Sequence, residues 1–397
     1  MMDEHIRAIQ GALHEAGVDG WLFADFRGSD PLAYRILRLS NVGMLSRRWY
    51  YYIPAAGEPR KLVHRIESHS LDPLPGRPSQ YASWTELHAQ LKSVLDHNRR
   101  VAMQYSPQNA IPYISRVDAG TVDLVRGFGV EVVSSADLVQ RFEAVWTPDQ
   151  WEAHQYAARS LRTIIDETFG YIRDAVTTQG GVSEHAVQQF ILGRFDHFGM
   201  RTDKPPIVAV NAHSADPHFQ PTPTSGLIRR GDFVLLDIWS KRKESRSVYA
   251  DITWTGYVGD AVPDTYRNTF HVVQRARDAA IEFVQDAVHE GRAICGWEVD
   301  EVARETVRRA GYGEHFIHRT GHSIGEEVHG NGANIDNYES RDERHILPHT
   351  CFSIEPGVYL PGQFGVRSEV DVYVSDRAAF VTGQPIQLGV VPILSLT

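Results

Sequence analysis

Apolar and polar positions in the first part of the chain follow helical spacing once and strand spacing several times. Four apolar residues recur at helical spacing before Gly17, which supplies a helix stop: Ile6, Ile9, Leu13 and Ala16. Short apolar runs of strand length follow, separated by glycine, proline and helical stretches, and they start at Trp21, Arg47, Lys61, Arg100 and Val130. This alternation predicts a small α/β domain with a mixed sheet. Within it, Trp49–Tyr52 is interpreted as a buried strand, with an interface patch as the alternative.

A strong helix start near residues 143–149 predicts a domain boundary. Thr147 is suited to the N-cap, Pro148 to the first turn, and Gln150 completes a capping box. We therefore expect an N-terminal domain of residues 1–146 and a second domain of residues 147–397.

The second domain is predicted to be α+β. Helical patterns start at Thr147, about Ser183, Pro263 and about Glu298. Strand-like runs start at Ile207, Phe233, Tyr249, Cys351 and Val366, the last of them read as one strand from Val366 to Val374. We expect these strands to form a sheet that the helices cover.

Composition is that of an ordinary globular protein, with 397 residues, 42% hydrophobic and 23% charged. A chain of this length needs no disulfides, and we expect Cys295 and Cys351 to be buried, reduced thiols. The N-terminus lacks the pattern of a secretory signal, and no apolar run has the length of a membrane span. We therefore expect a cytoplasmic protein without a membrane partner. The formal charge of −10 argues against nucleic acid as a partner.

Candidate chemistry enters with four acids in or next to apolar strand-like runs. They are Asp237 in FVLLDIW, Asp251 in YADITWT, Glu355 at the end of CFSIEP, and Glu369 in VRSEVDVYV. A buried carboxylate is costly unless it is paired or bound to a cation. Each acid alone could face water at a strand edge or pair with an arginine, but four in one domain favour a shared cation site.

A histidine between glycines adds a fifth group. His322 lies in RTGHSIGEEVHG between Gly321 and Gly325, and His329 follows seven residues later. Carboxylates with one imidazole form a hard ligand set that suits divalent Mn, Co or Zn and does not suit a thiolate zinc site.

Five stretches together resemble the M24 metallopeptidases, the pita-bread fold of methionine aminopeptidase, aminopeptidase P and Xaa-Pro dipeptidase (prolidase). They are VNAHSADPHFQP, GDFVLLDIW, YADITWTG, HRTGHSIGEEVHG and FSIEPGVYLPGQFGVRSE, in the family's order from about residue 150 to the end. The N-terminal domain resembles the creatinase/prolidase N-terminal domain more loosely. Its presence favours the proline-specific branch.

The resemblance implies a ligand set and two divalent metal ions per chain, Mn or Co, with Zn as an alternative. Asp237 would bind one metal, Asp251 and Glu369 would bridge both, and His322 and Glu355 would complete the shells. Two such cations can hold a bridging water and lower its pKa towards neutrality.

The resemblance also implies four catalytic residues: Glu355, His218, His329 and Arg367. Glu355 would take a proton from the water and pass it to the leaving nitrogen. His218 and His329 would lie near the substrate. Arg367 would share a strand face with Glu369 and would either hold that residue or bind a substrate carboxylate.

Three departures from the family pattern leave substrate preference open. Asp237 and Asp251 lie fourteen residues apart, where about eleven is usual, so SKRKESRSVY is interpreted as a longer exposed hairpin, with Lys241–Arg246 as a solvated turn. Val370 separates Glu369 from Asp371, so that Asp371 could replace Glu369 as a ligand. Gly330 follows His329 where an acid is common.

The function predicted is dinuclear metal-dependent hydrolysis of the Xaa-Pro bond, as in an Xaa-Pro dipeptidase. Short proline-containing peptides would be the substrates, and the family implies a homodimer. Three alternatives remain: an Xaa-Pro aminopeptidase, a non-peptide C–N hydrolase of the same fold, and a non-catalytic binding module. For three further histidines, His213, His315 and His318, a turn, strand or loop role is weighed against one beside the site.

Overall fold

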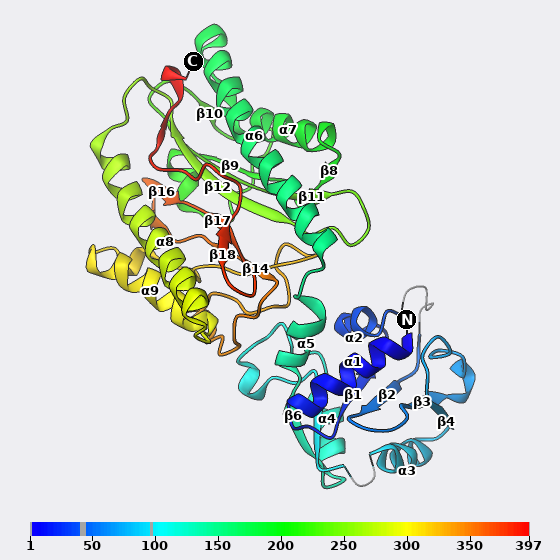
Figure 1. Ribbon diagram of the computed structural model, residues 1–397. Coiled ribbons are helices and arrows are strands. Elements are labelled where there is room, and N and C mark those ends of the chain that lie inside the picture. Colours follow the sequence, from blue (N-terminus) through cyan, green and yellow to red (C-terminus); the bar gives the residue numbers. More distant parts are fainter. Residues whose placement is uncertain (1, 40–44, 96–97, 397) are drawn as a thin grey trace. The chain divides into compact units, whose positions relative to one another are not determined.

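The computed structural model describes residues 2–39, 45–95 and 98–396. Its contacts divide the chain into two compact units, Met1–Glu143 and Ala144–Thr397 (Figure 1). No helix in the described ranges combines the length and the apolar content that a membrane crossing requires.

The N-terminal unit is a six-stranded sheet with helices on both faces. Its strands are Gly20–Asp25 (β1), Trp49–Pro54 (β2), Arg60–His64 (β3), Arg77–Tyr81 (β4), Arg100–Met103 (β5) and Glu131–Ser134 (β6), in the order β4-β3-β2-β1-β5-β6. Its helices are Met2–Glu15 (α1), Pro31–Ile36 (α2), Trp84–Val94 (α3), Ala119–Arg126 (α4) and Ala136–Glu143 (α5). Only β2 runs against its neighbours; the other pairs are parallel.

Alternation along the strands assigns side chains to the two faces of this sheet. Trp21 and Phe23 of β1 pack with α1, α2 and α5, whereas Leu22 and Ala24 pack with α3 and α4. The buried strand predicted at Trp49–Tyr52 is confirmed. Helix α1 ends at Glu15, so Ala16 is exposed and lies outside it.

The C-terminal unit combines long helices with several short sheets. Its helices are Pro148–Gln179 (α6), Glu184–His197 (α7), Asp264–Glu290 (α8) and Gly296–Arg309 (α9). Its strands are Val182–Ser183 (β7), Met200–Arg201 (β8), Ile207–Val210 (β9), Leu227–Ile228 (β10), Phe233–Arg242 (β11), Ala250–Tyr257 (β12), Ser323–Ile324 (β13), Thr350–Ile354 (β14), Gly357–Leu360 (β15), Phe364–Arg367 (β16), Val370–Val374 (β17), Ala379–Val381 (β18) and Val391–Pro392 (β19).

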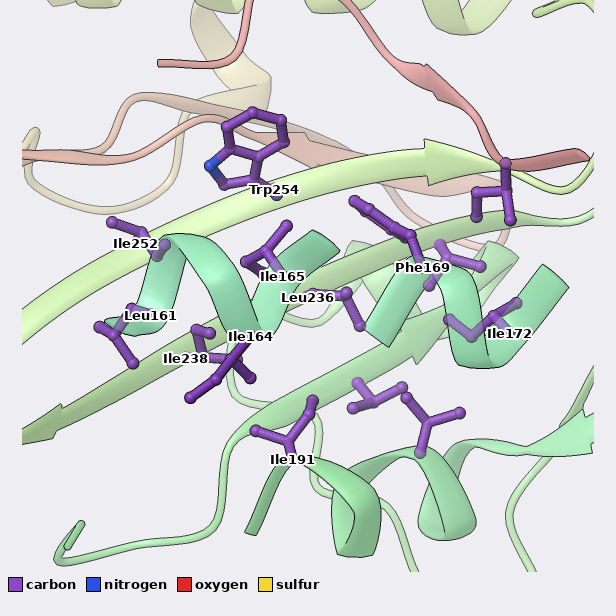
Figure 2. Packing of buried hydrophobic residues seen from close by; sticks show 14 of the residues in the cluster. Leu161, Ile164, Ile165, Phe169, Ile172, Ile191, Leu236, Ile238, Ile252 and Trp254 are labelled. Atoms are coloured by element: carbon purple, nitrogen blue, oxygen red, sulfur yellow. The ribbon is translucent and has the colours of Figure 1, made fainter. Parts of the chain in front are cut away.

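Helix α6 starts with the predicted capping box. The Thr147 side chain accepts from the Gln150 backbone N–H, and the Gln150 side chain accepts from the Thr147 N–H. The apolar stripe of α6 then packs on one face of β11 and β12, where Leu161 and Ile164 lie among Leu236, Ile238 and Ile252 (Figure 2). Residues that alternate with these on β11 and β12 therefore face away from α6.

A second core lies under α8 and α9. Their apolar faces pack against strands of the sheet β13-β14-β17-β18 and of the hairpin β15-β16. On the face of β11 and β12 opposite to α6, a smaller apolar cluster that includes Leu235 and Trp239 adjoins the buried polar residues described below.

Three details of the sequence-based prediction are wrong. The run Val366–Val374 is not one strand: β16 pairs with β15, whereas β17 pairs with β14 and β18, and the chain changes sheets at Ser368–Glu369. Lys241 is buried, because β11 continues to Arg242; only Lys243–Arg246 form an exposed turn. Cys295 is half-buried, whereas Cys351 is buried, and both are free thiols.

Candidate metal centre

Two of the candidate acids lie on neighbouring antiparallel strands. Asp237 on β11 is paired with Thr253, and Asp251 on β12 is paired with Trp239. Both carboxylates are on the face of the strands opposite to α6, and both residues are almost wholly buried, at 7% and 5% exposure. Strand alternation therefore explains why two acids occur in otherwise apolar sequences.

His322 is brought to this face by a tight approach of its loop to β14. A Cβ atom at Gly321 would lie 1.9 Å from the Ser353 carbonyl oxygen, so only glycine fits there. The Ser353 hydroxyl accepts from the His322 backbone N–H at 3.0 Å and donates to Glu355 Oε1 at 3.1 Å. One serine thus fixes both the imidazole-bearing loop and the acid that follows β14.

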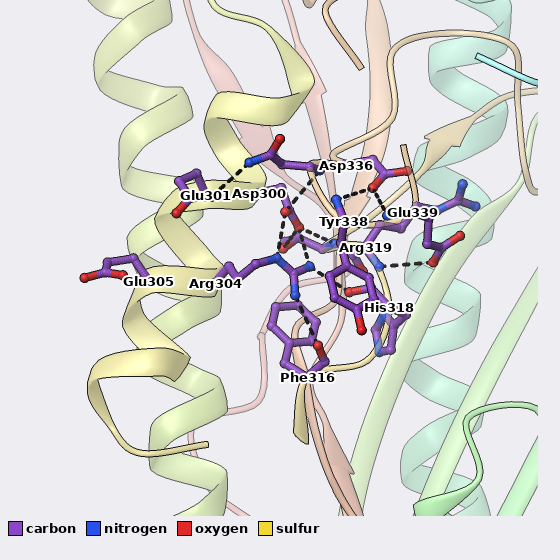
Figure 3. A network of polar contacts seen from close by, with 12 residues as sticks. Asp300, Glu301, Arg304, Glu305, Phe316, His318, Arg319, Asp336, Tyr338 and Glu339 are labelled. Atoms are coloured by element: carbon purple, nitrogen blue, oxygen red, sulfur yellow. Dashed lines mark hydrogen bonds and ion pairs between the residues drawn. The ribbon is translucent and has the colours of Figure 1, made fainter. Parts of the chain in front are cut away.

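Helix α9 fixes the residues just before His322. Asp300 accepts from the Thr320 backbone N–H at 2.8 Å and from its hydroxyl at 2.6 Å, while Arg304 donates two bonds to the same carboxylate (Figure 3). Arg304 also donates to the carbonyl oxygens of Phe316 and His318. These hydrogen bonds hold the backbone of the loop that precedes His322.

Three of the five candidate ligands form a compact group. Single ligand atoms of Asp251, His322 and Glu369 all lie within 4.8 Å of one another. His322 Nε2 is 3.8 Å from Asp251 Oδ2 and 3.4 Å from Glu355 Oε1, so Glu355 adjoins the same group. Asp237 is connected to this group by its ion pair with Arg367.

Arg367 contacts several of these acids, either directly or through Thr253. Its Nη2 forms an ion pair with Asp237, and its Nε donates to Thr253 Oγ1 at 3.1 Å. That hydroxyl in turn donates to Glu369 Oε2 at 2.7 Å. The Arg367 Nε also lies 3.9 Å from Glu355 Oε2. The guanidinium therefore lies against the acids, with its donors used by protein groups.

Burial and mutual repulsion shift the titration of these groups strongly. Burial first, and then the charges of Glu369 and Asp237, raise the pKa of Asp251 well above its ordinary value. Burial also raises the pKa of Glu369 well above its usual range and that of Glu355 to about 7. Burial lowers the pKa of His322 well below 6.5, so its imidazole is neutral and can coordinate a cation.

The residues present fit a divalent cation. Asp251 Oδ1 and Glu369 Oε1 are buried and have no hydrogen-bond partner among the described residues. Four carboxylates face one guanidinium, an imbalance that burial makes costly and that cations would relieve. Oxygen ligands with one neutral imidazole suit a hard or borderline divalent ion.

Comparisons with known proteins agree with this chemistry. A family model described as "Metallopeptidase family M24" matches residues 152–376, more than half of the chain. The chain belongs to this family.

Relatives and solved structures extend the match to both units. A probable dipeptidase PepE from Mycobacterium tuberculosis is 27% identical over 350 residues, covering 86% of this chain and 85% of that protein. An Xaa-Pro dipeptidase from Lactobacillus helveticus is 29% identical over 259 residues, 65% of each chain. The crystal structure of dipeptidase PepE from Mycobacterium ulcerans superposes with a TM-score of 0.72 at 25% identity, covering 98% of both chains. A prolidase from Thermococcus sibiricus gives 0.64 at 23% identity, covering 98% of this chain and 99% of that one.

The predicted α+β pita-bread fold and the metallopeptidase class are thereby confirmed. The protein is an M24 metallopeptidase, a hydrolase that acts on peptides.

The two histidines predicted to lie near the substrate, His218 and His329, are more exposed than the candidate ligands. His329 is exposed, with its ring centroid 4.2 Å from that of His322 in an edge-on arrangement. His218 is exposed too, and no hydrogen bond ties its side chain to a ligand, although its charge influences the pKa of Asp237. Both are accessible to a substrate, unlike the buried acids.

Gly330 has a packing explanation. A Cβ atom there would lie 2.9 Å from Ser323 Oγ and 3.2 Å from the Gly325 nitrogen, so a larger side chain at this position would require its neighbours to shift. Asp371 contacts one of the candidate ligands: its Oδ2 accepts from the Asp251 backbone N–H at 2.8 Å.

Three contributing residues were not identified from the sequence: Thr253, Ser353 and Tyr359. The first two lie two positions after Asp251 and two before Glu355, and strand alternation could have indicated both. Tyr359 accepts from Arg367 Nη1 at 3.1 Å and lies 2.8 Å from His318 Nε2. His318 is thus attached to the site through Tyr359, while His213 Nδ1 lies within hydrogen-bond distance of Glu184, at 2.8 Å, and His315 lies in a short 3-10 turn.

Proposed function

We propose that this protein is a dinuclear metal-dependent dipeptidase that hydrolyses Xaa-Pro dipeptides. The observation that carries the proposal is the convergence of Asp251, His322 and Glu369, with two buried carboxylate oxygens lacking partners. Relatives named Xaa-Pro dipeptidase and prolidase support the proline preference.

In this proposal the five ligands hold two cations, Mn or Co with Zn as an alternative. Asp251, His322 and Glu369 would hold the cations together with Asp237 and Glu355. When bound, such cations lower the pKa of a water molecule and polarise the scissile carbonyl. The neutral state of His322 and the unpartnered oxygens of Asp251 and Glu369 support this assignment.

Glu355 is proposed to carry the proton. Its pKa is raised to about 7 by burial, which Arg367 opposes, and a bound cation would oppose it further. Its Oε1 is held by the Ser353 hydroxyl at 3.1 Å, so the carboxylate has a fixed direction. From there it accepts a proton from the attacking water and gives it to the leaving nitrogen, which in an Xaa-Pro bond is a tertiary amide nitrogen.

His218 and His329 are proposed to act on the substrate side. His329 is exposed beside His322, and His218 is exposed and close enough to Asp237 to affect its pKa, so each can donate a hydrogen bond to the substrate carbonyl or to the tetrahedral intermediate.

Arg367 is assigned to positioning. Asp237, Thr253 and Tyr359 each engage a different nitrogen of its guanidinium. These contacts favour the interpretation that Arg367 holds the acids in place, and they argue against its binding a substrate carboxylate.

The test is a peptidase assay on the Mn-loaded and Co-loaded full chain. Xaa-Pro dipeptides, Xaa-Pro-Yaa tripeptides and matched Xaa-Ala dipeptides are compared by kcat/KM. The proposal predicts cleavage of Xaa-Pro dipeptides in preference to both other sets. Cleavage of tripeptides alone would establish an aminopeptidase instead, and equal rates on Xaa-Ala would remove the proline preference.

A paired variant tests the site itself. Glu355→Ala is expected to abolish turnover, whereas Glu314→Ala, an exposed glutamate of the same unit, should retain it. An active Glu355→Ala enzyme would exclude the proton-transfer role.

A further inference from the structure

The N-terminal unit contains a cavity of about 830 Å³, here called the N-unit cavity. Part of its lining comes from the carboxyl ends of the parallel strands β1, β3 and β4, namely from the last residues of β3 and β4 and from residues that follow β1 and β4. The two residues that precede the antiparallel β2 also line it. In open α/β sheets this edge is where ligands bind, since the connecting helices begin there. The cavity volume is in the range of small-molecule sites.

Two arginines line the N-unit cavity. Arg47 and Arg48 are exposed, and neither guanidinium is within ion-pair distance of a carboxylate in the described residues. Arg47 and Arg48 interact electrostatically with Glu67 and Asp118, respectively, and both arginines remain exposed and available to an anion in a chain with a formal charge of −10. The acid in the lining is Asp118, whose oxygens already accept from the Thr121 backbone N–H at 2.9 Å and hydroxyl at 2.6 Å.

Two helices also begin at the cavity. Ser83 caps α3 and Asp118 caps α4, and both residues, with the first residues of each helix, belong to its lining. Both helices pack on the same face of the sheet. The N-terminal backbone N–H groups of these helices add positive potential to that of the arginines, which the Asp118 carboxylate partly offsets at α4.

Aromatic surface completes the lining. The Phe26 and Trp84 side chains are 48% and 68% exposed, and both border the cavity. His88 meets Trp84 edge-on with ring centroids 5.4 Å apart, which fixes the orientation of the indole. Exposed aromatic rings beside arginines recognise flat ligands by stacking and anions by charge.

We propose that the N-unit cavity binds an organic anion that carries a planar ring. The anionic group lies against Arg47, Arg48 and the two helix ends, and the ring lies against Phe26 and Trp84. Neither the metal ligands nor the proposed substrate is involved, so this site is independent of the peptidase reaction.

The experiment is isothermal titration calorimetry on the Mn-loaded full chain with adenosine 5′-monophosphate as the probe. Adenosine and inorganic phosphate are titrated separately, because each carries only half of the proposed recognition. The variant is Arg47→Gln/Arg48→Gln. Its control is Arg7→Gln, an exposed arginine on α1, which packs on the opposite face of the sheet. Circular dichroism melting verifies that all proteins fold.

The monophosphate is expected to bind the wild type and Arg7→Gln with a dissociation constant below about 1 mM. The double variant should bind the monophosphate at least about tenfold more weakly, because it loses hydrogen bonds from charged groups to the anion. Adenosine and phosphate should each bind more weakly than the monophosphate.

Three results would overturn the proposal. They are the absence of saturable binding, equal binding by the folded double variant, and binding of phosphate or adenosine as tight as that of the monophosphate. Equal binding by the variant would place the probe elsewhere, for instance on the metals.

Discussion

Thr253 offers the sharpest test of how the acids are held. Its hydroxyl donates to Glu369 Oε2 at 2.7 Å and accepts from Arg367 Nε at 3.1 Å, and the residue is wholly buried. Thr253→Val keeps the shape of the side chain and the β-branched preference for the strand. It removes both hydrogen bonds and leaves a carboxylate oxygen and a guanidinium N–H without their partner.

The magnitude follows from these two bonds. Hydrogen bonds to charged groups contribute about 1.5–3 kcal/mol each, so the free energy of unfolding of the metal-free protein should fall by about 3 kcal/mol or more. Groups that orient metal ligands typically influence metal affinity by about 10–100-fold, and we expect the same loss for Mn.

Urea unfolding in the presence of chelator and Mn titration of the metal-free protein measure the two effects. Thr255→Val is the matched control on the same strand face. Its hydroxyl lies 3.4 Å from Gln387 Oε1, which keeps the Thr255 backbone N–H as a donor at 3.0 Å. The control should lose under about 1 kcal/mol and no metal affinity. Equal behaviour of the two variants would refute the role assigned to Thr253.

Further variants test the electrostatics and the loop. Asp251→Asn removes one of four mutually repelling carboxylates, so the metal-free protein should become more stable to urea. The same variant should bind Mn at least about 100-fold more weakly. Unchanged Mn affinity would contradict the ligand role. Asp300→Asn removes a buried ion pair with Arg304 and weakens the hydrogen bonds to Thr320, so the free energy of unfolding should fall by about 3–5 kcal/mol. A loss below about 1 kcal/mol would show that this network contributes little to stability. Burial lowers the pKa of His154 to about 4, so below about pH 6.5 the unfolded chain binds a proton at this residue and the folded chain does not. The free energy of unfolding should therefore fall by about 3 kcal/mol as the pH falls from 6.5 to 4. An equal dependence of the unfolding free energy on pH in His154→Gln would contradict this.

The sequence was informative where burial and periodicity act together. Asp237 and Asp251 are recognisable because strands covered by a helix tolerate an acid only for a specific reason. The α6 start at Thr147 was predictable because a capping box is local.

Features set by distant contacts were not predictable. β4 (RPSQY) carries little apolar signal, since it is an edge strand with only Tyr81 buried. The break at Ser368–Glu369 depends on which partners β16 and β17 find. Lys241 reads as a surface charge, yet its ammonium donates to the Glu326 carbonyl and lies over the Tyr249 ring. For Lys241 the hydrogen-bond partner lies 85 residues away in the sequence.

The measurement that tests the central claim most directly is the number of divalent ions per chain. Metal-free protein is loaded with Mn or Co, freed of loosely bound ions, and analysed for metal content while peptidase activity is followed against added metal. The account predicts about two ions per chain, with activity rising as they bind. Fewer than one tightly retained or activating ion per chain would contradict it.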